Sequence, residues 1–115
     1  MHEFALAHHL LGIILPKVPE ETKVTRIDLA IGVLAGVSLP SLEFGFEVAS
    51  EGTPAQGAKL SVRTVGLSCR CKTCALTYAP DTIADPASWC CPSCGEGLGE
   101  ILTGREMEIE QIEVE

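Results

Sequence analysis

The sequence predicts a small α/β (α+β) fold, in which two helices cover a mixed or antiparallel three-stranded sheet and a cysteine-rich module is inserted between two strands. Apolar residues recur at helical spacing in residues 3–15 and 39–50. They alternate with polar residues in residues 23–34, 60–65 and 106–115, which is the pattern of strands with one buried face. Two Cys-x-x-Cys pairs separate the second of these strands from the third. A chain of 115 residues has the size of one ordinary domain, or of a small domain that carries an even smaller metal-stabilised module.

The first predicted helix, residues 3–15, is mostly core, and Pro16 ends it. Its apolar stripe consists of Phe4, Leu6, Ala7, Leu10, Leu11, Ile13 and Ile14. His8 and His9 lie on the same helix. We expect them to be exposed or capping residues, because position 9 of a helix that starts at residue 3 lies nearly two turns, about 9 Å, from the chain start.

The second predicted helix begins after Ser38, a preferred N-cap residue, and Pro40 fits its first turn. Glu43 and Glu47 are four residues apart and are expected to face outward. The residues expected to pack on the sheet are Leu39, Leu42, Phe46 and Ala49.

Four cysteines have the spacing of a tetrathiolate metal site. Cys71 and Cys74 form one Cys-x-x-Cys pair, Cys91 and Cys94 form another, and sixteen residues separate the two pairs. The intervening loop lets one tight turn face the other, so four sulfurs can surround a zinc ion at about 2.3 Å. Gly95 suits the positive φ that such a turn often needs. Four protein thiolates leave no position for water or substrate, so we expect this zinc to be structural.

Other uses of these cysteines stay open. Disulfides suit a secreted chain, and no signal peptide is visible in the sequence. Rubredoxin-like iron uses the same four-sulfur geometry. A redox Cys-x-x-Cys motif would need one pair only and is expected beside a βαβ pattern. Cys69 and Cys90 are expected to be small, partly buried bystanders, although either could be a ligand in a shifted register.

We expect two parts in the chain: an α/β domain formed by residues 1–68 together with 104–115, and a zinc-ribbon module formed by residues 69–103. The module cannot bury enough apolar surface alone, so the ion must supply much of its folding free energy. The formal charge is −8, and without a basic face we expect no nucleic-acid partner. Because no apolar run approaches the roughly 20 residues that cross a bilayer, we expect no membrane association and a cytoplasmic location.

The chain begins Met1-His2-Glu3, and these residues carry the most specific chemistry in the sequence. Bulky His2 should block removal of Met1, which leaves a free α-amine one residue from an imidazole. Nickel(II) and copper(II) favour a square plane of nitrogen donors. The Met1 amine, the ionised His2 amide and the His2 imidazole Nδ1 can fill three corners of that square through two chelate rings. The fourth corner stays open for another donor, as expected of a site that receives a metal and hands it on.

Further motifs accompany this N-terminus along nearly the whole chain. They are a short apolar helix, the segment from Gly32 to Val37, Phe44-Gly45-Phe46-Glu47, Gly52-Thr53, the double Cys-x-x-Cys, and a terminal strand with Gly104-Arg105-Glu106. Together with Met-His-Glu they resemble the HypA/HybF family of hydrogenase nickel metallochaperones.

The resemblance implies two metal sites: nickel at Met1, His2 and Glu3, and structural zinc at Cys71, Cys74, Cys91 and Cys94. It also implies that Ni(II) is a transient cargo for a [NiFe]-hydrogenase large-subunit precursor. A nickel-handling GTPase of the same maturation pathway is the second implied partner, and a homodimer is left open. The sequence contains no phosphate-cradling glycine loop and no Ser/His/Asp arrangement, so we expect no enzyme. The alternative is a zinc-ribbon module that binds protein or nucleic acid without nickel transfer.

Overall fold

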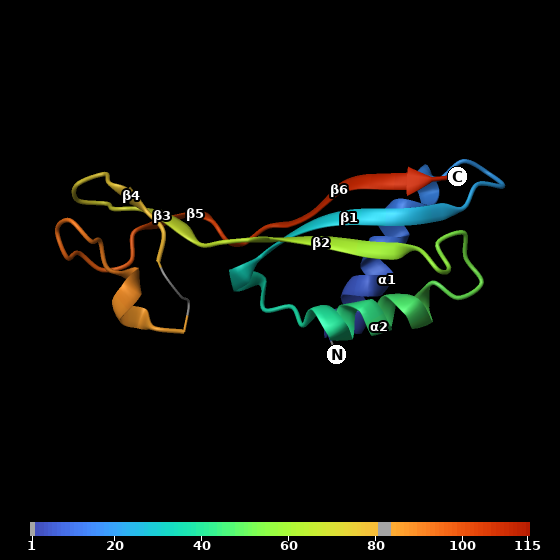
Figure 1. Ribbon diagram of the computed structural model, residues 1–115, viewed down its shortest axis with the longest axis horizontal. Helices are drawn as coiled ribbons and strands as arrows, with labels where there is room; N and C mark the ends of the chain where they lie inside the picture. Colours follow the sequence, from blue (N-terminus) through green and yellow to red (C-terminus); the bar gives the residue numbers. More distant parts are fainter. Residues whose placement is uncertain (1, 81–83) are drawn as a thin grey trace. The chain divides into compact units, whose positions relative to one another are not determined.

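The computed structural model describes residues 2–80 and 84–115, with the backbone alone for His2 (Figure 1). The chain divides into two compact units. The helical unit consists of Met1–Leu29, Val37–Arg63 and Ile109–Glu115, and the cysteine unit consists of Ala30–Gly36 and Thr64–Glu108. The expected assignment of nickel to residues 1–68 with 104–115, and of zinc to residues 69–103, stays a prediction.

Both predicted helices form, and each buries one face. α1 (His2–Ile14) is followed by a short 3-10 turn that contains Pro16, as predicted for its end. α2 (Leu39–Ala49) begins directly after Ser38, and Glu43 and Glu47 are exposed on it, as predicted. The buried apolar side chains of the two helices are Ala7, Leu10, Leu11 and Ile14 on α1, and Leu42 and Phe46 on α2. None of the described helices is long and apolar enough to span a membrane.

Phe4 departs from the predicted apolar stripe of α1. It is 37% exposed, and its ring meets the ring of His8 edge-on, with the two centroids 4.7 Å apart. The first turn of α1 contacts α2 through its backbone instead, because a Cβ atom at Gly45 would lie 3.3 Å from the Cα atom of Phe4. Gly45 therefore allows the start of α1 to lie close to α2.

The first sheet has the order β2-β1-β6, with the bounds Lys59–Val65, Val24–Gly32 and Met107–Val114. Gly32 N–H donates to the Glu106 carbonyl at 2.8 Å, and Glu115 N–H donates to the Lys23 carbonyl at 3.0 Å. The residue numbers along β6 rise where those along β1 fall, so the two strands are antiparallel. α2 connects β1 to β2, and these two strands run in the same direction in Figure 1. The sheet is therefore mixed, which is one of the two predicted arrangements.

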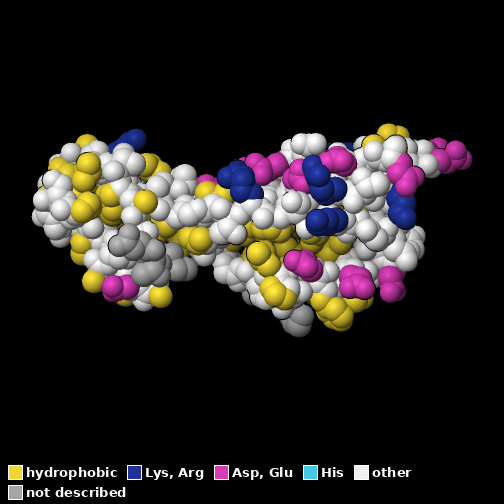
Figure 2. Space-filling view, viewed as in Figure 1, with side chains coloured by type: hydrophobic (Ala, Val, Ile, Leu, Met, Phe, Trp, Pro, Cys, Tyr) yellow, Lys and Arg dark blue, Asp and Glu magenta, His cyan; other side chains and the backbone are white. Residues whose placement is uncertain are grey.

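Charged side chains of both signs lie close together on the helical unit. The face shown in Figure 2 carries acidic and basic groups interspersed over the strands and helices, and it shows no continuous basic patch.

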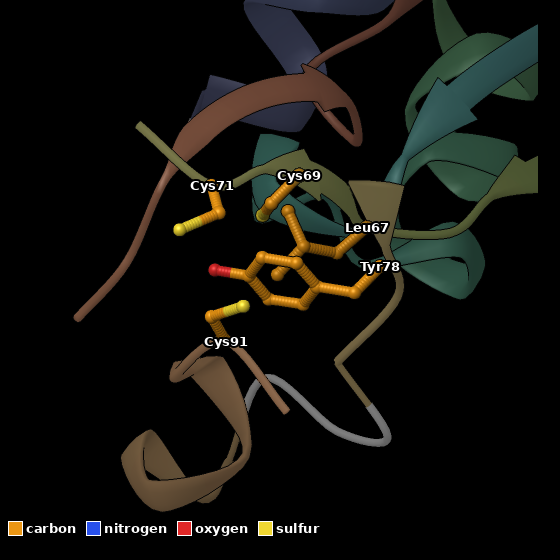
Figure 3. Packing of buried hydrophobic residues seen from close by; sticks show 5 residues of the cluster. All are labelled: Leu67, Cys69, Cys71, Tyr78 and Cys91. Atoms are coloured by element: carbon orange, nitrogen blue, oxygen red, sulfur yellow. The ribbon is translucent and has the colours of Figure 1, made fainter. Parts of the chain in front are cut away.

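The cysteine unit contains a second, smaller sheet. Its three antiparallel strands have the order β4-β3-β5, with the bounds Thr77–Tyr78, Ser68–Arg70 and Glu100–Thr103. The sequence did not predict these strands, because segments of two to four residues are too short for a period-2 pattern. The buried cluster of this unit, shown in Figure 3, consists of Leu67, Cys69, Cys71, Tyr78 and Cys91.

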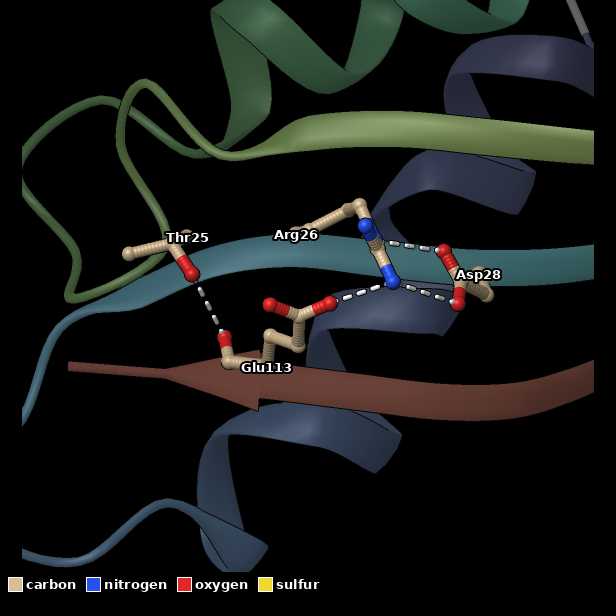
Figure 4. Close-up of polar contacts among 4 residues, drawn as sticks. All are labelled: Thr25, Arg26, Asp28 and Glu113. Carbon is tan, nitrogen blue, oxygen red and sulfur yellow. Dashed lines mark hydrogen bonds and ion pairs between the residues drawn. The ribbon is translucent and has the colours of Figure 1, made fainter.

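Ion pairs join the strands of the first sheet within the helical unit. Arg26 of β1 lies 2.9 Å from Asp28 and also pairs with Glu113 of β6 (Figure 4). Arg63 of β2 donates two hydrogen bonds to Glu110 of β6, of 3.2 and 2.9 Å, and these bonds lower the pKa of Glu110. Because β1 lies between β2 and β6, the second pair crosses the central strand. Such exposed pairs add about 1 kcal/mol at most, so they fix the strand register more than they stabilise the fold.

Two glycines let the backbone pack closely where β1 ends in the cysteine unit. A Cβ atom at Gly32 would lie 2.1 Å from the Gly104 carbonyl oxygen, which also accepts the Leu34 N–H at 2.8 Å. Gly104 has a φ of 122°, which residues with a side chain rarely adopt.

We expect the substitution Gly32→Ala to lower the free energy of unfolding by about 2–3 kcal/mol, because the added methyl group would overlap main-chain atoms that cannot move aside. Gly12→Ala is the matched control. Gly12 lies within α1, and a Cβ atom there would meet nothing within 4 Å, so this variant should gain about 0.5–1 kcal/mol. Denaturant unfolding of the metal-saturated proteins measures both changes, and an unaltered Gly32→Ala variant would contradict the close approach.

Candidate metal centre

The first Cys-x-x-Cys pair lies on a tight turn, residues 71–76, which we call the first knuckle. The Ala75 N–H donates to the Cys71 carbonyl at 3.0 Å, and the Cys71 N–H donates to the Leu76 carbonyl at 2.8 Å. Ala75 has a φ of 63°, in the left-handed region. Alanine rarely adopts this conformation, so the residue type did not predict it.

The second pair repeats this geometry in residues 91–96, the second knuckle. The Gly95 N–H donates to the Cys91 carbonyl at 2.9 Å, and the Cys91 N–H donates to the Glu96 carbonyl at 2.8 Å. Gly95 has a φ of 75°, as predicted for this position. The two knuckles therefore present their cysteines through the same backbone hydrogen bonds.

The knuckles bring together the four cysteines that were predicted as ligands. The sulfur atoms of Cys71, Cys74, Cys91 and Cys94 all lie within 4.8 Å of one another. The Sγ atoms of Cys71 and Cys94 are 3.5 Å apart, and those of Cys74 and Cys91 are 3.6 Å apart. A tetrahedron of sulfurs at about 2.3 Å from a zinc ion has edges of about 3.8 Å, so the donor set fits a tetrathiolate metal. None of the six cysteines is joined in a disulfide in the structure.

Hydrogen bonds divide the four thiols into two kinds. Backbone N–H groups of the first knuckle, chiefly that of Cys74, lower the pKa of Cys71 to about 6. Those of the second knuckle, chiefly that of Cys94, lower the pKa of Cys91. For Cys74 and Cys94, too, a backbone N–H acts to lower the pKa. Hydrogen bonds to neighbouring thiols and burial act against it and are stronger together. The pKa of Cys74 therefore rises, and that of Cys94 rises to about 12. Without metal, Cys71 is therefore a thiolate at neutral pH, whereas Cys74 and Cys94 keep their protons.

Other candidate ligands lie outside this cluster. Cys69 is fully buried opposite Tyr78 in the second sheet, and burial raises the pKa of its thiol. Cys90 is exposed and takes no part in the group of four. His8 and His9 are both exposed on α1, as predicted. Among the side chains that the structure describes, the four knuckle cysteines form the one group arranged to hold an ion.

The predicted nickel residues lie at the start of α1. Met1 and the side chain of His2 lie outside the described residues. Glu3 is buried, and its Oε2 atom accepts a hydrogen bond of 3.2 Å from the backbone N–H of Ser38, the N-cap residue of α2. The Oγ atom of Ser38 lies 3.1 Å from that of Ser41 and makes no capping bond, so the predicted N-cap position is right but its side chain does not cap. A carboxylate suits this place, because the first N–H groups of a helix lack partners and favour negative charge.

The two left-handed positions provide a matched test of the knuckle geometry. Ala75→Gly should raise the free energy of unfolding by about 0.5 kcal/mol, because glycine adopts positive φ without a steric cost. Gly95→Ala should lower it by about 1 kcal/mol, although a Cβ atom there would meet nothing within 4 Å. Denaturant titration of the metal-loaded variants tests both, and changes of the same sign in the two variants would refute the shared geometry.

Metal loading should release protons, because a bound thiol must be ionised. Near pH 7.5 we expect Cys74 and Cys94, whose pKa values are raised, to release one proton each, and Cys71, whose pKa is lowered to about 6, to release almost none. Below pH 6 Cys71 also takes up a proton in the metal-free protein, so the affinity should fall more steeply with acid there. Calorimetric zinc titrations in buffers of different ionisation enthalpy count these protons. A release close to four at pH 7.5 would show that all four thiols start out neutral.

Comparison with known proteins agrees with this geometry. The family model described as "Hydrogenase/urease nickel incorporation, metallochaperone, hypA" matches residues 1–114. The hydrogenase maturation factor HypA of Chloroflexus aggregans is 36% identical over 115 residues, with 98% of each chain covered. That of Roseiflexus sp. (strain RS-1) is 38% identical, with 100% of this chain and 93% of the relative covered.

The fold also resembles solved structures. The solution structure of the Ni metallochaperone HypA from Helicobacter pylori matches with a TM-score of 0.61 at 17% identity, over 96% of this chain and 95% of that chain. A second solution structure, of a HypA protein, matches with a TM-score of 0.56 at 21% identity. These likenesses concern the fold, and the sequence matches above carry the relationship. The chain therefore belongs to the HypA family of hydrogenase and urease nickel-incorporation metallochaperones, which are maturation factors and not enzymes.

Proposed function

We propose that this chain binds Ni(II) at its N-terminus and passes it to the large-subunit precursor of a [NiFe]-hydrogenase. The nickel ion is cargo, held by Met1 and His2 with Glu3 beside them. A structural Zn²⁺ ion is held by Cys71, Cys74, Cys91 and Cys94. The match of the family model from residue 1 onward supports the first part, and the cluster of four sulfurs supports the second.

The observation that carries the nickel proposal is the position of α1, which begins at His2. The first four N–H groups of a helix have no acceptor within it. The His2 amide can therefore lose its proton and bind a metal without breaking a helical hydrogen bond. Together with the Met1 amine and the His2 imidazole, it supplies three nitrogen donors of the kind that Ni(II) favours in a square plane.

Charge balance gives Glu3 a part in this site. A nickel ion bound by a neutral amine, a neutral imidazole and one ionised amide keeps a net charge of +1. The Glu3 carboxylate follows directly in the chain and is buried, so it can offset that charge where the helix N-terminus otherwise disfavours a cation. A direct bond from its Oε2 atom to the metal would require release of the Ser38 N–H.

The fourth corner of the nickel plane explains transfer without free metal. A thiolate or imidazole of the recipient can enter this corner and then replace the donors of the chaperone one at a time. The large-subunit precursor is the recipient in this proposal. A nickel-handling GTPase of the same pathway assists the exchange, which takes place in the cytoplasm.

The knuckle cysteines have a different task. Four sulfur donors suit zinc and also the iron of rubredoxin-like sites, and four protein ligands leave no position for a substrate. Among the described residues of the cysteine unit the buried cluster has five members, so the ion contributes much of the folding free energy of this unit. Elemental analysis of protein purified without added metal distinguishes zinc from iron.

The nickel proposal is tested by titrating Ni(II) into protein with an authentic N-terminus and into its His2→Ala variant. The wild type should show the visible d–d band of a planar complex, and the His2→Ala variant should lose it, with affinity lower by about 100-fold, because the substitution removes the imidazole donor and the chelate ring that it closes with the amide. The control is His9→Ala, which removes an exposed histidine from the same helix and should bind as the wild type does.

Equal binding by the wild type and the His2→Ala variant would overturn the nickel site. The chain would then be a zinc-ribbon interaction module without nickel transfer. The delivery step has its own test, in which nickel-loaded protein is mixed with purified large-subunit precursor in the presence of a chelator. Nickel should appear in the precursor faster than the chelator can release it from the chaperone.

A further inference from the structure

Tyr78 lies at the centre of the cysteine unit and takes no part in the ligand set. It belongs to β4, directly after the first knuckle, and is 8% exposed. Its ring packs in the buried cluster, and Figure 3 shows it between Cys71 and Cys91, with its hydroxyl end toward both. A side chain that follows one knuckle thus packs in the same cluster as one ligand of each knuckle.

The Tyr78 hydroxyl makes two hydrogen bonds, and both go to the segments that flank the second knuckle. It donates to the Trp89 carbonyl at 2.7 Å and accepts the Gly99 N–H at 3.1 Å. Trp89 lies two residues before Cys91, and Gly99 lies five residues after Cys94. One oxygen atom therefore links the segment that leads into the second knuckle to the segment that leaves it.

Close backbone packing completes this arrangement. A Cβ atom at Gly99 would lie 2.2 Å from the Arg70 carbonyl oxygen and 3.1 Å from the Cα atom of Cys71. The segment that leaves the second knuckle thus lies against the residue that precedes the first knuckle. The Gly99 N–H, bonded to Tyr78, sits at this junction.

The two knuckles are not equivalent in this respect. Residues of the second knuckle lie 20 positions after their counterparts in the first, as Cys91 follows Cys71, so Leu98 is the counterpart of Tyr78. Leu98 is 41% exposed, and its side chain has no polar group that could donate or accept an equivalent hydrogen bond. The link between the knuckles is therefore made by the side chain that follows the first of them.

We propose that the Tyr78 hydroxyl is a positioning group for the metal centre, which holds the second knuckle against the first so that four sulfurs face one point before the ion arrives. This rests on the proposal that the four cysteines hold zinc. Groups that orient metal ligands without touching the metal affect the affinity because the ligands must otherwise be ordered when the metal binds. Tyr78→Phe removes the hydroxyl and keeps the ring in the cluster.

The test compares the full-length wild type, Tyr78→Phe and Ser68→Ala in competition with a chromophoric zinc chelator. Tyr78→Phe should bind zinc about 10- to 100-fold more weakly and release it correspondingly faster. Ser68→Ala is the matched control, because its hydroxyl lies 2.6 Å from that of Thr103 in the same unit but contacts no knuckle. It should stay within about threefold of the wild type.

Two further readouts separate positioning from general loss of stability. In the cobalt-substituted protein, Tyr78→Phe should alter the energies and intensities of the d–d bands, which report the shape of the sulfur tetrahedron, whereas Ser68→Ala should leave them unchanged. The amide of Gly99 should also exchange with deuterium faster in Tyr78→Phe. Equal zinc affinities for the wild type and Tyr78→Phe would overturn this inference and leave the zinc site intact. Failure of the wild type to bind zinc would instead overturn the proposed function.

Discussion

The convergence of four sulfur atoms is the constraint on which the cysteine unit depends. Its buried cluster has five residues, and two of them, Cys71 and Cys91, are also knuckle ligands. Backbone N–H groups favour the thiolates of these two, while the pKa values of Cys74 and Cys94 are raised, so the metal-free tetrad cannot be fully ionised at neutral pH. A divalent ion removes this conflict, because it replaces the protons and attracts all four sulfurs. Folding of this unit and metal binding are therefore coupled.

The helical unit meets a different requirement, which is to hold the beginning of the chain in place. α1 starts at His2, and its first turn is fixed by two contacts with the region of α2: the Glu3 carboxylate on the Ser38 N–H, and the close approach of Gly45 to Phe4. Chain ends are otherwise the least ordered parts of a domain.

The regular elements could be predicted where one periodicity lasts for many residues. The stripe of α1, the Ser38–Pro40 start of α2 and the alternation along β1 each give such a signal, and all three form. The second sheet could not be predicted, since strands of two to four residues carry no pattern of their own. The left-handed Ala75 was missed for a similar reason. Only the hydrogen bonds of its knuckle impose that conformation, against the preference of alanine.

By itself the sequence predicted the four cysteines that the structure brings together, because the spacing within each Cys-x-x-Cys pair is local. It determined the family in the same way, through motifs whose order along the chain is visible without coordinates. The tertiary structure alone decided which groups support those ligands. Glu3 and Ser38 are 35 residues apart, and the Tyr78 hydroxyl reaches Gly99 over 21 residues. Such contacts depend on how two turns or two helices pack, and no local pattern of residues encodes that distance.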